Sequence, residues 1–273
     1  MELSIFSTVT NPEQRGDCYE PAINCYTGLA DEVIQVDGSH TDFGLYTDGK
    51  NIKNYHEWPK EFNWTFIGQQ FQRGYELCSG DWVLHCDLDF IFHEQDYSAI
   101  RQACENNPEA PALSFWKYQF ILPDRYTLKS RLVIAVNKGK YGDRIRFDSG
   151  GDLCQPSLDG EYIKPESVPE ARIPFYNYEK ILKTKAQIAE DCGRMERAYK
   201  RHFGSYQMGS DGTDESAYQA WLKMTVGRFY AREQKHIPLS DHPKVMQETI
   251  ELLKPEQFGY NGHNNLEVND YHA

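Results

Sequence analysis

The sequence predicts an α/β protein in which a mixed, mainly parallel sheet is flanked by helices and followed by a C-terminal helical extension. Residues 2–37 have the pattern of a strand, a helix and a second strand, which together make a βαβ unit. Residues 82–86 form a nearly continuous apolar run, typical of a strand buried on both faces of a parallel sheet. Residues 112–147 contain strand-like runs separated by turn residues, which indicates a meander. We therefore expect parallel and antiparallel strands in one sheet.

The βαβ unit contains the clearest elements. Apolar and β-branched residues over 2–10 indicate a buried strand that breaks at Asn11. Apolar residues then recur at helical spacing from about residue 19, and residues 32–37 form a second strand that ends on the carboxylate of Asp37. The crossover between the two strands is expected to be right-handed.

The next part of the chain alternates between loop, helix and strand. Residues 38–60 have weak periodicity and many Gly, Asp, Asn and His residues, so we expect mainly loop. Residues 64–78 have the spacing of a long amphipathic helix, which stops at a Ser-Gly pair. The apolar strand at 82–86 follows and leads directly into Asp87, and another helix is expected at about 96–105.

The second half of the chain changes character. We expect strands at 112–122, 127–136 and 140–147, a loop over 148–175, and helices at 177–203, 214–225 and 242–253. The sequence is accordingly divided into an α/β domain at 1–175 and a mainly helical extension at 176–273 that packs on it.

Composition excludes several classes of protein. The 273 residues carry 29 Lys and Arg against 41 Asp and Glu, a formal charge of −12, whereas a general nucleic-acid binder needs a basic face. No apolar run approaches the length of a membrane span, and the N-terminus lacks the basic segment of a secretory signal. The 7 cysteines contain no C-x-x-C pair, which argues against a zinc site or a disulfide framework. We expect a cytoplasmic protein.

The strongest chemical signal is Asp87-Leu88-Asp89 at the carboxyl end of the buried strand. Residues two apart in an extended chain face the same way, so both carboxylates are expected to project into one space. Two unpaired carboxylates close together are unfavourable in free energy. A bound divalent cation, which prefers oxygen ligands, usually neutralises them. Ligands of open α/β sheets also bind beyond the carboxyl ends of the strands. A purely structural role, in which these aspartates only cap the following turn, is less favoured because Glu94 and Asp96 can already cap the helix that follows.

With this context the chain resembles the GT-A glycosyltransferases, particularly the family 2-like members, over roughly residues 2–105. The resemblance is carried by four features: a first strand ending in Thr8-Val9-Thr10-Asn11, a second ending in Val36-Asp37-Gly38-Ser39, a helix closed by Cys78-Ser79-Gly80-Asp81-Trp82, and the apolar strand into Asp87-Leu88-Asp89. It implies a GT-A fold in which Asp37 contacts the nucleoside of a sugar nucleotide. It also implies that Asp87 and Asp89 hold Mn²⁺ or Mg²⁺ on the diphosphate.

The same resemblance assigns further residues to binding of a nucleoside-diphosphate sugar, of the UDP or GDP type. These are Thr8, Thr10 and Asn11 after the first strand, and Gln72 in a helical stretch where the family commonly has Arg-Asn-x-Gly. The physical argument agrees, because a chain at −12 needs local positive charge to hold two phosphates. Arg15, in the loop after the first strand, is the candidate, although a solvated loop position explains it equally well.

The implied reaction is transfer of a sugar to a hydroxyl acceptor such as a glycan, with inversion at the anomeric carbon. An inverting displacement needs a general base near the acceptor oxygen. In the family this acid follows a β-rich stretch, which favours Asp152 and, second, Asp148. Many GT-A enzymes also take a third metal ligand, often a His, from the C-terminal region, and His242 is the candidate.

Three other functions remain open. The string around Asp87 also fits a phosphatase or phosphotransferase of the haloacid dehalogenase type, although that motif normally opens its domain. A nucleotidyltransferase shares the metal and phosphate chemistry, but the single glycine between Asn11 and Asp17 is a poor match to its Gly-rich loop. A non-catalytic sugar-binding protein on the same fold would function without Asp87 or Asp89.

Overall fold

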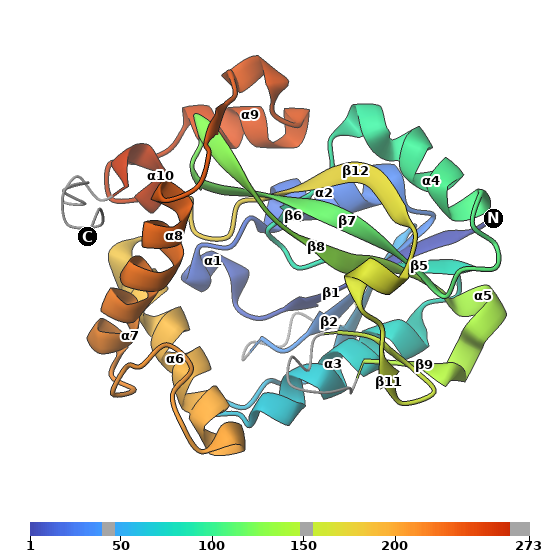
Figure 1. Ribbon diagram of the computed structural model, residues 1–273, viewed down its shortest axis with the longest axis horizontal. Helices are drawn as coiled ribbons and strands as arrows, with labels where there is room; N and C mark the ends of the chain where they lie inside the picture. Colours follow the sequence, from blue (N-terminus) through green and yellow to red (C-terminus); the bar gives the residue numbers. More distant parts are fainter. Residues whose placement is uncertain (40–46, 148–154, 263–273) are drawn as a thin grey trace.

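The computed structural model describes residues 1–39, 47–147 and 155–262, and it confirms a mixed α/β fold with helices on both faces of one sheet (Figure 1). The order of the strands is β3-β4-β2-β1-β5-β8-β7-β12-β6, and β13 pairs with β8 beside this path. The strands of this sheet are β1 (Leu3–Val9), β2 (Glu32–Asp37), β3 (Thr47–Asp48), β4 (Asn51–Tyr55), β5 (Trp82–His85), β6 (Phe90–Ile91), β7 (Ala112–Leu122), β8 (Arg125–Asn137), β12 (Glu170–Asn177) and β13 (Lys235–His236).

The helices are α1 (Pro12–Arg15), α2 (Tyr19–Leu29), α3 (Trp64–Leu77), α4 (Tyr97–Glu105), α5 (Lys138–Tyr141), α6 (Lys185–Phe203), α7 (Asp214–Trp221), α8 (Gly227–Tyr230), α9 (Lys244–Glu251) and α10 (Phe258–Asn261). A small second sheet joins β9 (Ile145–Arg146), β10 (Ser157–Leu158) and β11 (Glu161–Tyr162). No helix in the described ranges has both the length and the apolar character needed to cross a membrane.

The parallel part of the sheet places the ends of β1, β2 and β5 along one edge. β1 pairs in parallel with β2 on one side and with β5 on the other, with Phe6 opposite Ile34 and His85. Every residue of β5 is buried, as its apolar sequence predicts. Because the three strands run the same way, the residues that follow them meet beyond one edge, where ligands of such sheets bind.

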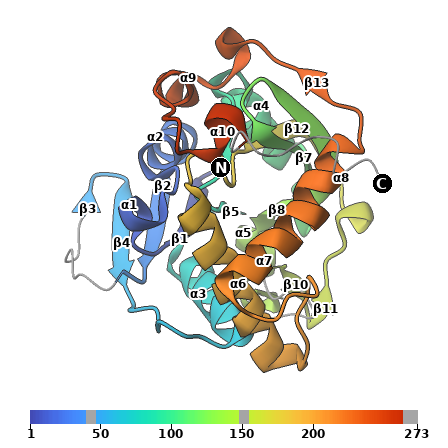
Figure 2. The ribbon, with the colours of Figure 1, turned by 90° about the vertical axis from the view of Figure 1, so that its left-hand side faces the viewer.

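Two layers of side chains cover this sheet. On one face, α2 and α4 bury Ala22, Leu29 and Ile100 against residues of β1 and β5. On the other face, α3 buries Ile67, Phe71 and Tyr75 against Phe6 and Val83. A third apolar cluster joins α6 to α7 and α10, and Figure 2 shows α6 and α7 side by side.

Four of the predicted elements differ from the structure. The predicted loop at 38–60 contains β4, a partly exposed strand whose sequence, NIKNY, gives no apolar alternation. The predicted strand at 140–147 is mostly α5 and a 3-10 turn, and only β9 pairs. The predicted loop at 148–175 contains most of β12. The helix predicted from residue 177 begins at Lys185 instead.

The late start of α6 has a clear local cause. Thr184 and Gln187 form a capping box: the hydroxyl of Thr184 accepts from the Gln187 backbone N–H, and the Gln187 side chain accepts from the Thr184 N–H. Before Thr184, β12 continues to Asn177, and the backbone N–H of Tyr178 donates to the Asp89 carbonyl at 2.9 Å. The predicted boundary between 175 and 176 therefore falls inside β12.

Removing the cap should weaken α6 measurably. We expect Thr184→Ala to lower the free energy of unfolding by about 1 kcal/mol, because one orphan N–H of the first turn loses its partner. Thr184→Ser keeps the hydroxyl and should stay close to the wild type. Urea denaturation followed by circular dichroism measures the difference, and equal stability of the alanine and serine variants would contradict the role of the cap.

Candidate functional site

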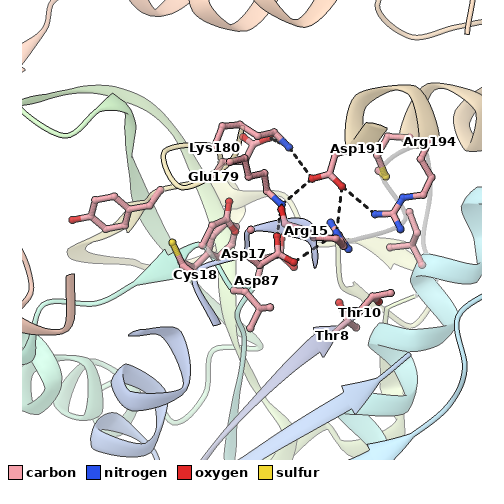
Figure 3. A pocket seen from close by; sticks show the side chains of 18 of the residues that line it. Thr8, Thr10, Arg15, Asp17, Cys18, Asp87, Glu179, Lys180, Asp191 and Arg194 are labelled. Atoms are coloured by element: carbon pink, nitrogen blue, oxygen red, sulfur yellow. Dashed lines mark hydrogen bonds and ion pairs between the residues drawn. The ribbon is translucent and has the colours of Figure 1, made fainter. Parts of the chain in front are cut away.

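A cavity of about 350 Å³ lies beyond the carboxyl ends of β1 and β5 (Figure 3). Its walls come from several parts of the chain, among them the end of β1, α1 with the loop after it, the loop after β5, β7, the segment between β12 and α6, and α6 itself. Apolar side chains, including Trp58, Phe62 and Phe71, complete one wall. The lining also includes five acidic and five basic residues.

The backbone around β5 brings Asp87 and Asp89 to this cavity. The last hydrogen bond between β1 and β5 runs from the Cys86 N–H to the Phe6 carbonyl at 3.1 Å, so the paired strands end immediately before Asp87. A turn follows, in which the Phe90 N–H donates to the Asp87 carbonyl at 2.8 Å. Tyr26 of α2 holds this turn, because its hydroxyl donates to the backbone carbonyl of Asp87. The side chain of Asp87 is 45% exposed.

Asp89 is the more enclosed of the two acids. Its Oδ2 accepts from the Asn177 side-chain amide at 2.6 Å, so β12 fixes its orientation. Loss of hydration, the Asp87 carboxylate and the Glu179 carboxylate together raise the pKa of Asp89 to about 7, against the opposing effects of Lys117 and the Asn177 hydrogen bond. Charge on Asp89 is thus disfavoured unless a cation joins it.

The donor set of Asp87 and Asp89 fits a divalent cation bound together with substrate oxygens. Within the described ranges, no three or more His, Cys, Asp or Glu side chains are grouped closely enough to hold a metal ion by themselves. Two carboxylates nevertheless match the way Mg²⁺ is usually held, with one or two carboxylates and the rest of its shell from phosphates and water. Burial and the neighbouring carboxylates raise the pKa of Asp89, and a bound cation would favour its charged form.

A cluster of basic side chains surrounds the buried carboxylate of Asp191, and we call it the Asp191 cluster. Lys183 Nζ lies 2.9 Å from Asp191 Oδ2, and Lys180 Nζ lies 3.6 Å from the same atom. Arg15 Nε and Arg194 Nη2 lie 3.3 and 3.4 Å from Asp191 Oδ1 (Figure 3). Burial would raise the pKa of Asp191, but Lys180, Arg15, Lys183 and Arg194 hold it well below its ordinary value.

Contacts between α1 and α6 bring these cations together. Lys183 also pairs with Asp17, and its ammonium donates to the Arg15 carbonyl at 2.6 Å. The Gln187 amide of α6 donates to the Gln14 carbonyl at 2.8 Å. α1 ends at Gly16, which has a φ of 64° and approaches Gln187 so closely that a Cβ would lie 2.9 Å from its Oε1. Glycine thus allows both the turn and the docking of α6.

Five of the predicted site residues lie together in this cavity: Thr8, Thr10, Arg15, Asp87 and Asp89. Asp37 is buried at the end of β2, where its carboxylate accepts from the Ser39 N–H at 2.9 Å, and it does not line the cavity. Asn11 is the N-cap of α1, and its N–H donates to the Ser39 hydroxyl at 2.9 Å.

Three further predicted site residues are Gln72, Asp148 and Asp152. Gln72 lines a separate pocket beside Arg73 and accepts from the Phe147 N–H at 2.9 Å. The candidate bases Asp148 and Asp152 lie outside the described residues.

His242 is a correction to the predicted ligand set. Its Nε2–H donates to the Pro123 carbonyl at 2.8 Å, so its Nδ1 accepts from the Tyr178 hydroxyl at 2.7 Å. The ring is buried and does not line the cavity, and neither nitrogen has a lone pair left for a metal ion. Burial also lowers the pKa of His242.

Sequence reasoning missed seven charged residues that line the cavity: Asp17, Lys117, Glu179, Lys180, Lys183, Asp191 and Arg194. Their positions in the sequence give one partial signal, since Asp191 and Arg194 are three apart and therefore share a face of α6. The other five come from the loop after α1, from β7 and from the segment after β12, which only the folded sheet brings to the same place.

Some solved structures are similar to this chain in fold, at low sequence identity. No family model and no curated protein matches the sequence. Among solved structures, residues 1–349 of S. aureus TarS in complex with UDP are 10% identical with a TM-score of 0.43, over 85% of this chain and 72% of that one. The mannosyltransferase PcManGT from Pyrobaculum calidifontis, in complex with GDP-Man and Mn²⁺, is 11% identical with a TM-score of 0.40, over 83% and 71%.

A structure with a different activity is also similar to the chain. The 2-C-methyl-D-erythritol 4-phosphate cytidylyltransferase from Thermus thermophilus is 15% identical with a TM-score of 0.32, over 93% of this chain and 99% of that one. With TM-scores below 0.5, none of these similarities assigns a family or a reaction to the chain.

The raised pKa of Asp89 makes the stability of the metal-free protein depend on pH. The folded state keeps this proton up to a pH of about 7, whereas the unfolded chain loses it near 3.8, so the contribution of Asp89 to stability is lost as the pH rises through this window. In EDTA, the melting temperature of Asp89→Asn minus that of the wild type should therefore increase from about pH 5 to about pH 8. Parallel melting profiles for the two proteins would contradict the assignment.

Proposed function

We propose that this protein is a metal-dependent glycosyltransferase that moves a sugar from a nucleoside-diphosphate sugar, of the UDP or GDP type, to a hydroxyl group of a glycan. One observation supports this most directly: Asp87 and Asp89 share a single cavity with the basic side chains of the Asp191 cluster. The acids suit a divalent cation and the bases suit phosphate oxygens. A diphosphate can bind the metal ion held by the acids and can also accept hydrogen bonds from the basic side chains, so this ligand matches both halves of the set.

The position of the cavity agrees with a nucleotide ligand. It lies beyond the carboxyl ends of parallel strands, and Thr8 and Thr10 at the end of β1 offer hydroxyls on its floor. Trp58, Phe62 and Phe71 supply an apolar wall of the kind that accepts a flat base or a sugar face. We propose that Asp37, at the end of the neighbouring strand β2, contacts the nucleoside.

The chemistry proposed for the site needs few protein groups. A divalent cation, Mn²⁺ or Mg²⁺, held by Asp87 and Asp89 would neutralise charge on the departing diphosphate. Asp152, or else Asp148, removes the proton from the acceptor hydroxyl. The acceptor oxygen bonds to the anomeric carbon as the bond from that carbon to the phosphate oxygen breaks, and its electron pair leaves with the nucleoside diphosphate. Attack from the opposite face inverts the anomeric carbon.

Binding of the donor can be measured without knowledge of the acceptor. UDP- or GDP-sugars with Mn²⁺ should raise the melting temperature of the wild type, because a ligand that binds only the folded state stabilises it. Asp89→Asn should abolish the Mn²⁺-dependent part of this shift, while Asp96→Asn, an acid of the same stretch that does not line the cavity, should retain it. Stabilisation by phosphate esters and by no nucleotide sugar would favour the phosphatase instead.

Loss of the base should separate binding from transfer. We expect Asp152→Asn to reduce sugar transfer by roughly a hundredfold or more, in the range of general-base catalysis, with an unchanged dissociation constant for the donor. Transfer to a mixture of glycans, or slow hydrolysis of the donor by water, can be followed by release of the nucleoside diphosphate. If Asp152→Asn and Asp148→Asn both kept wild-type rates, neither residue would be the base.

A further inference from the structure

Two parts of the chain, β8 and residues 222–236, are basic although the protein as a whole has a formal charge of −12. β8 carries three Lys and Arg residues and no acid, and residues 222–236 carry four against one acid, Glu233. The two parts are neighbours, because β13 pairs with β8 in the antiparallel direction, with Lys235 opposite Tyr126. The fold therefore concentrates positive charge beside β8.

Four cations of this region have no acidic partner: Lys117 of β7, Lys129 of β8, Arg228 of α8, and Arg232 in the turn after α8. We call them the Lys129 patch. Other cations of β8 are already paired, Arg131 with Glu170 at 3.0 Å and Arg125 with Asp124 at 2.7 Å. Within the described part of the chain, no carboxylate forms an ion pair with a member of the patch.

Lys117 and Lys129 project from the same face of the sheet. Gln119 and Thr127 lie opposite each other on β7 and β8, and residues paired in this way share a face. Because side chains alternate along a strand, Lys117 and Lys129, each two residues away from this pair, belong to the same face. A register shift lies beside Lys117, but its charge nevertheless acts on Lys129 and lowers the pKa of that ammonium.

The members of the patch act on one another as like charges. Lys129 is exposed, yet partial loss of hydration and the charges of the other three cations lower its pKa to about 8. Glu179 opposes this effect, but it is itself paired with Lys180 at 3.4 Å. Asp89 is a second acid near Lys117, and the proposed function assigns its charge to the metal ion. An anion bound to the patch would relieve the repulsion.

Lys117 connects the patch to the cavity. It is 9% exposed and lines the cavity, and its Nζ lies 5.6 Å from the centroid of the Phe90 ring. It forms no hydrogen bond or ion pair with another described residue. A nearly buried ammonium without an acceptor is unfavourable in free energy, so its three donors are available to a ligand that enters the cavity.

We propose that the Lys129 patch binds a negatively charged group of the acceptor, so that the acceptor is an acidic glycan. This inference rests on the proposed function in one respect, that the acceptor is a glycan. The donor diphosphate is proposed to bind the metal ion and the Asp191 cluster, whereas the patch comes from β7, β8, α8 and the turn after α8. A protein of charge −12 repels an acidic glycan as a whole, so it needs a local basic surface to hold one.

The test compares the binding of glucose, glucuronic acid and glucose 6-phosphate, with UDP or GDP and Mn²⁺ present to occupy the donor site. Titrations followed by nuclear magnetic resonance give the dissociation constants, because this method suits weak ligands. At least one of the two acidic sugars should bind about tenfold more tightly than glucose, and its affinity should fall as salt is added. The acid that binds more tightly distinguishes a carboxylate-bearing acceptor from a phosphate-bearing one.

Variants of the patch locate this binding. Lys129→Gln and the double variant Arg228→Gln with Arg232→Gln should each weaken the binding of the acidic sugar about tenfold, because charge-assisted hydrogen bonds are lost. The weak affinity for glucose should not change. Each variant should also keep the Mn²⁺-dependent rise in melting temperature with the sugar nucleotide, since the patch is separate from the proposed donor site.

Lys185→Gln is the matched control, because it removes one exposed positive charge at a surface pair with Glu215. It should bind the acidic sugar like the wild type, and circular dichroism checks that every variant is folded. Equal affinities for glucose and both acids, or acid binding that the patch variants leave unchanged, would overturn the inference while leaving the proposed function intact. Acid binding that depends on Lys129, in a protein that no nucleotide sugar stabilises, would support the patch and count against the proposed function.

Discussion

The packing of α1, the segment after β12 and α6 around the cavity depends on a single buried carboxylate, that of Asp191. Asp191 pairs with cations from α1, from the segment after β12 and from α6 itself, and so connects the first helix of the chain to the second half of the sequence. Removing a partner from such a buried network typically costs about 3–5 kcal/mol, because the remaining charges lose their compensation. The capping box at Thr184 and the contact between Gln187 and α1 place the helix so that Asp191 reaches its partners.

The lining of the cavity mixes acids and bases. Asp87 and Asp89 follow β5, and on the side of α1 and α6 the cations of the Asp191 cluster are paired with Asp17 and Asp191. Burial and the neighbouring carboxylates raise the pKa of Asp89 to about 7, and the buried Nε–H of Arg194 has no hydrogen-bond partner among the described residues. The metal-bound diphosphate of the proposed function would bring a cation to Asp89 and an anion to the basic side chains.

Local sequence signals predicted the part of the site that belongs to the parallel strands. The apolar run of β5 and the strand ending at Val9 placed Asp87, Asp89, Thr8 and Thr10 at one edge, and the structure confirms that they line one cavity. The predictions were wrong where tertiary contacts determine the structure of a segment or the role of a residue. β4 has no apolar alternation because it is a partly exposed strand near the edge of the sheet. His242 was offered as a ligand, yet its ring is used inside the fold by Tyr178 and Pro123.

The sequence by itself determined the α/β class, the parallel strands and the paired acids, because strand periodicity and the direction of side chains along a strand are local properties. Only the tertiary structure decided which cations face those acids. Arg15 and Arg194 are separated by most of the chain, and their approach depends on α6 docking against α1. A long-range contact of this kind leaves no periodic trace in the sequence, because periodicity reflects the local structure of one segment and not its packing against a distant one.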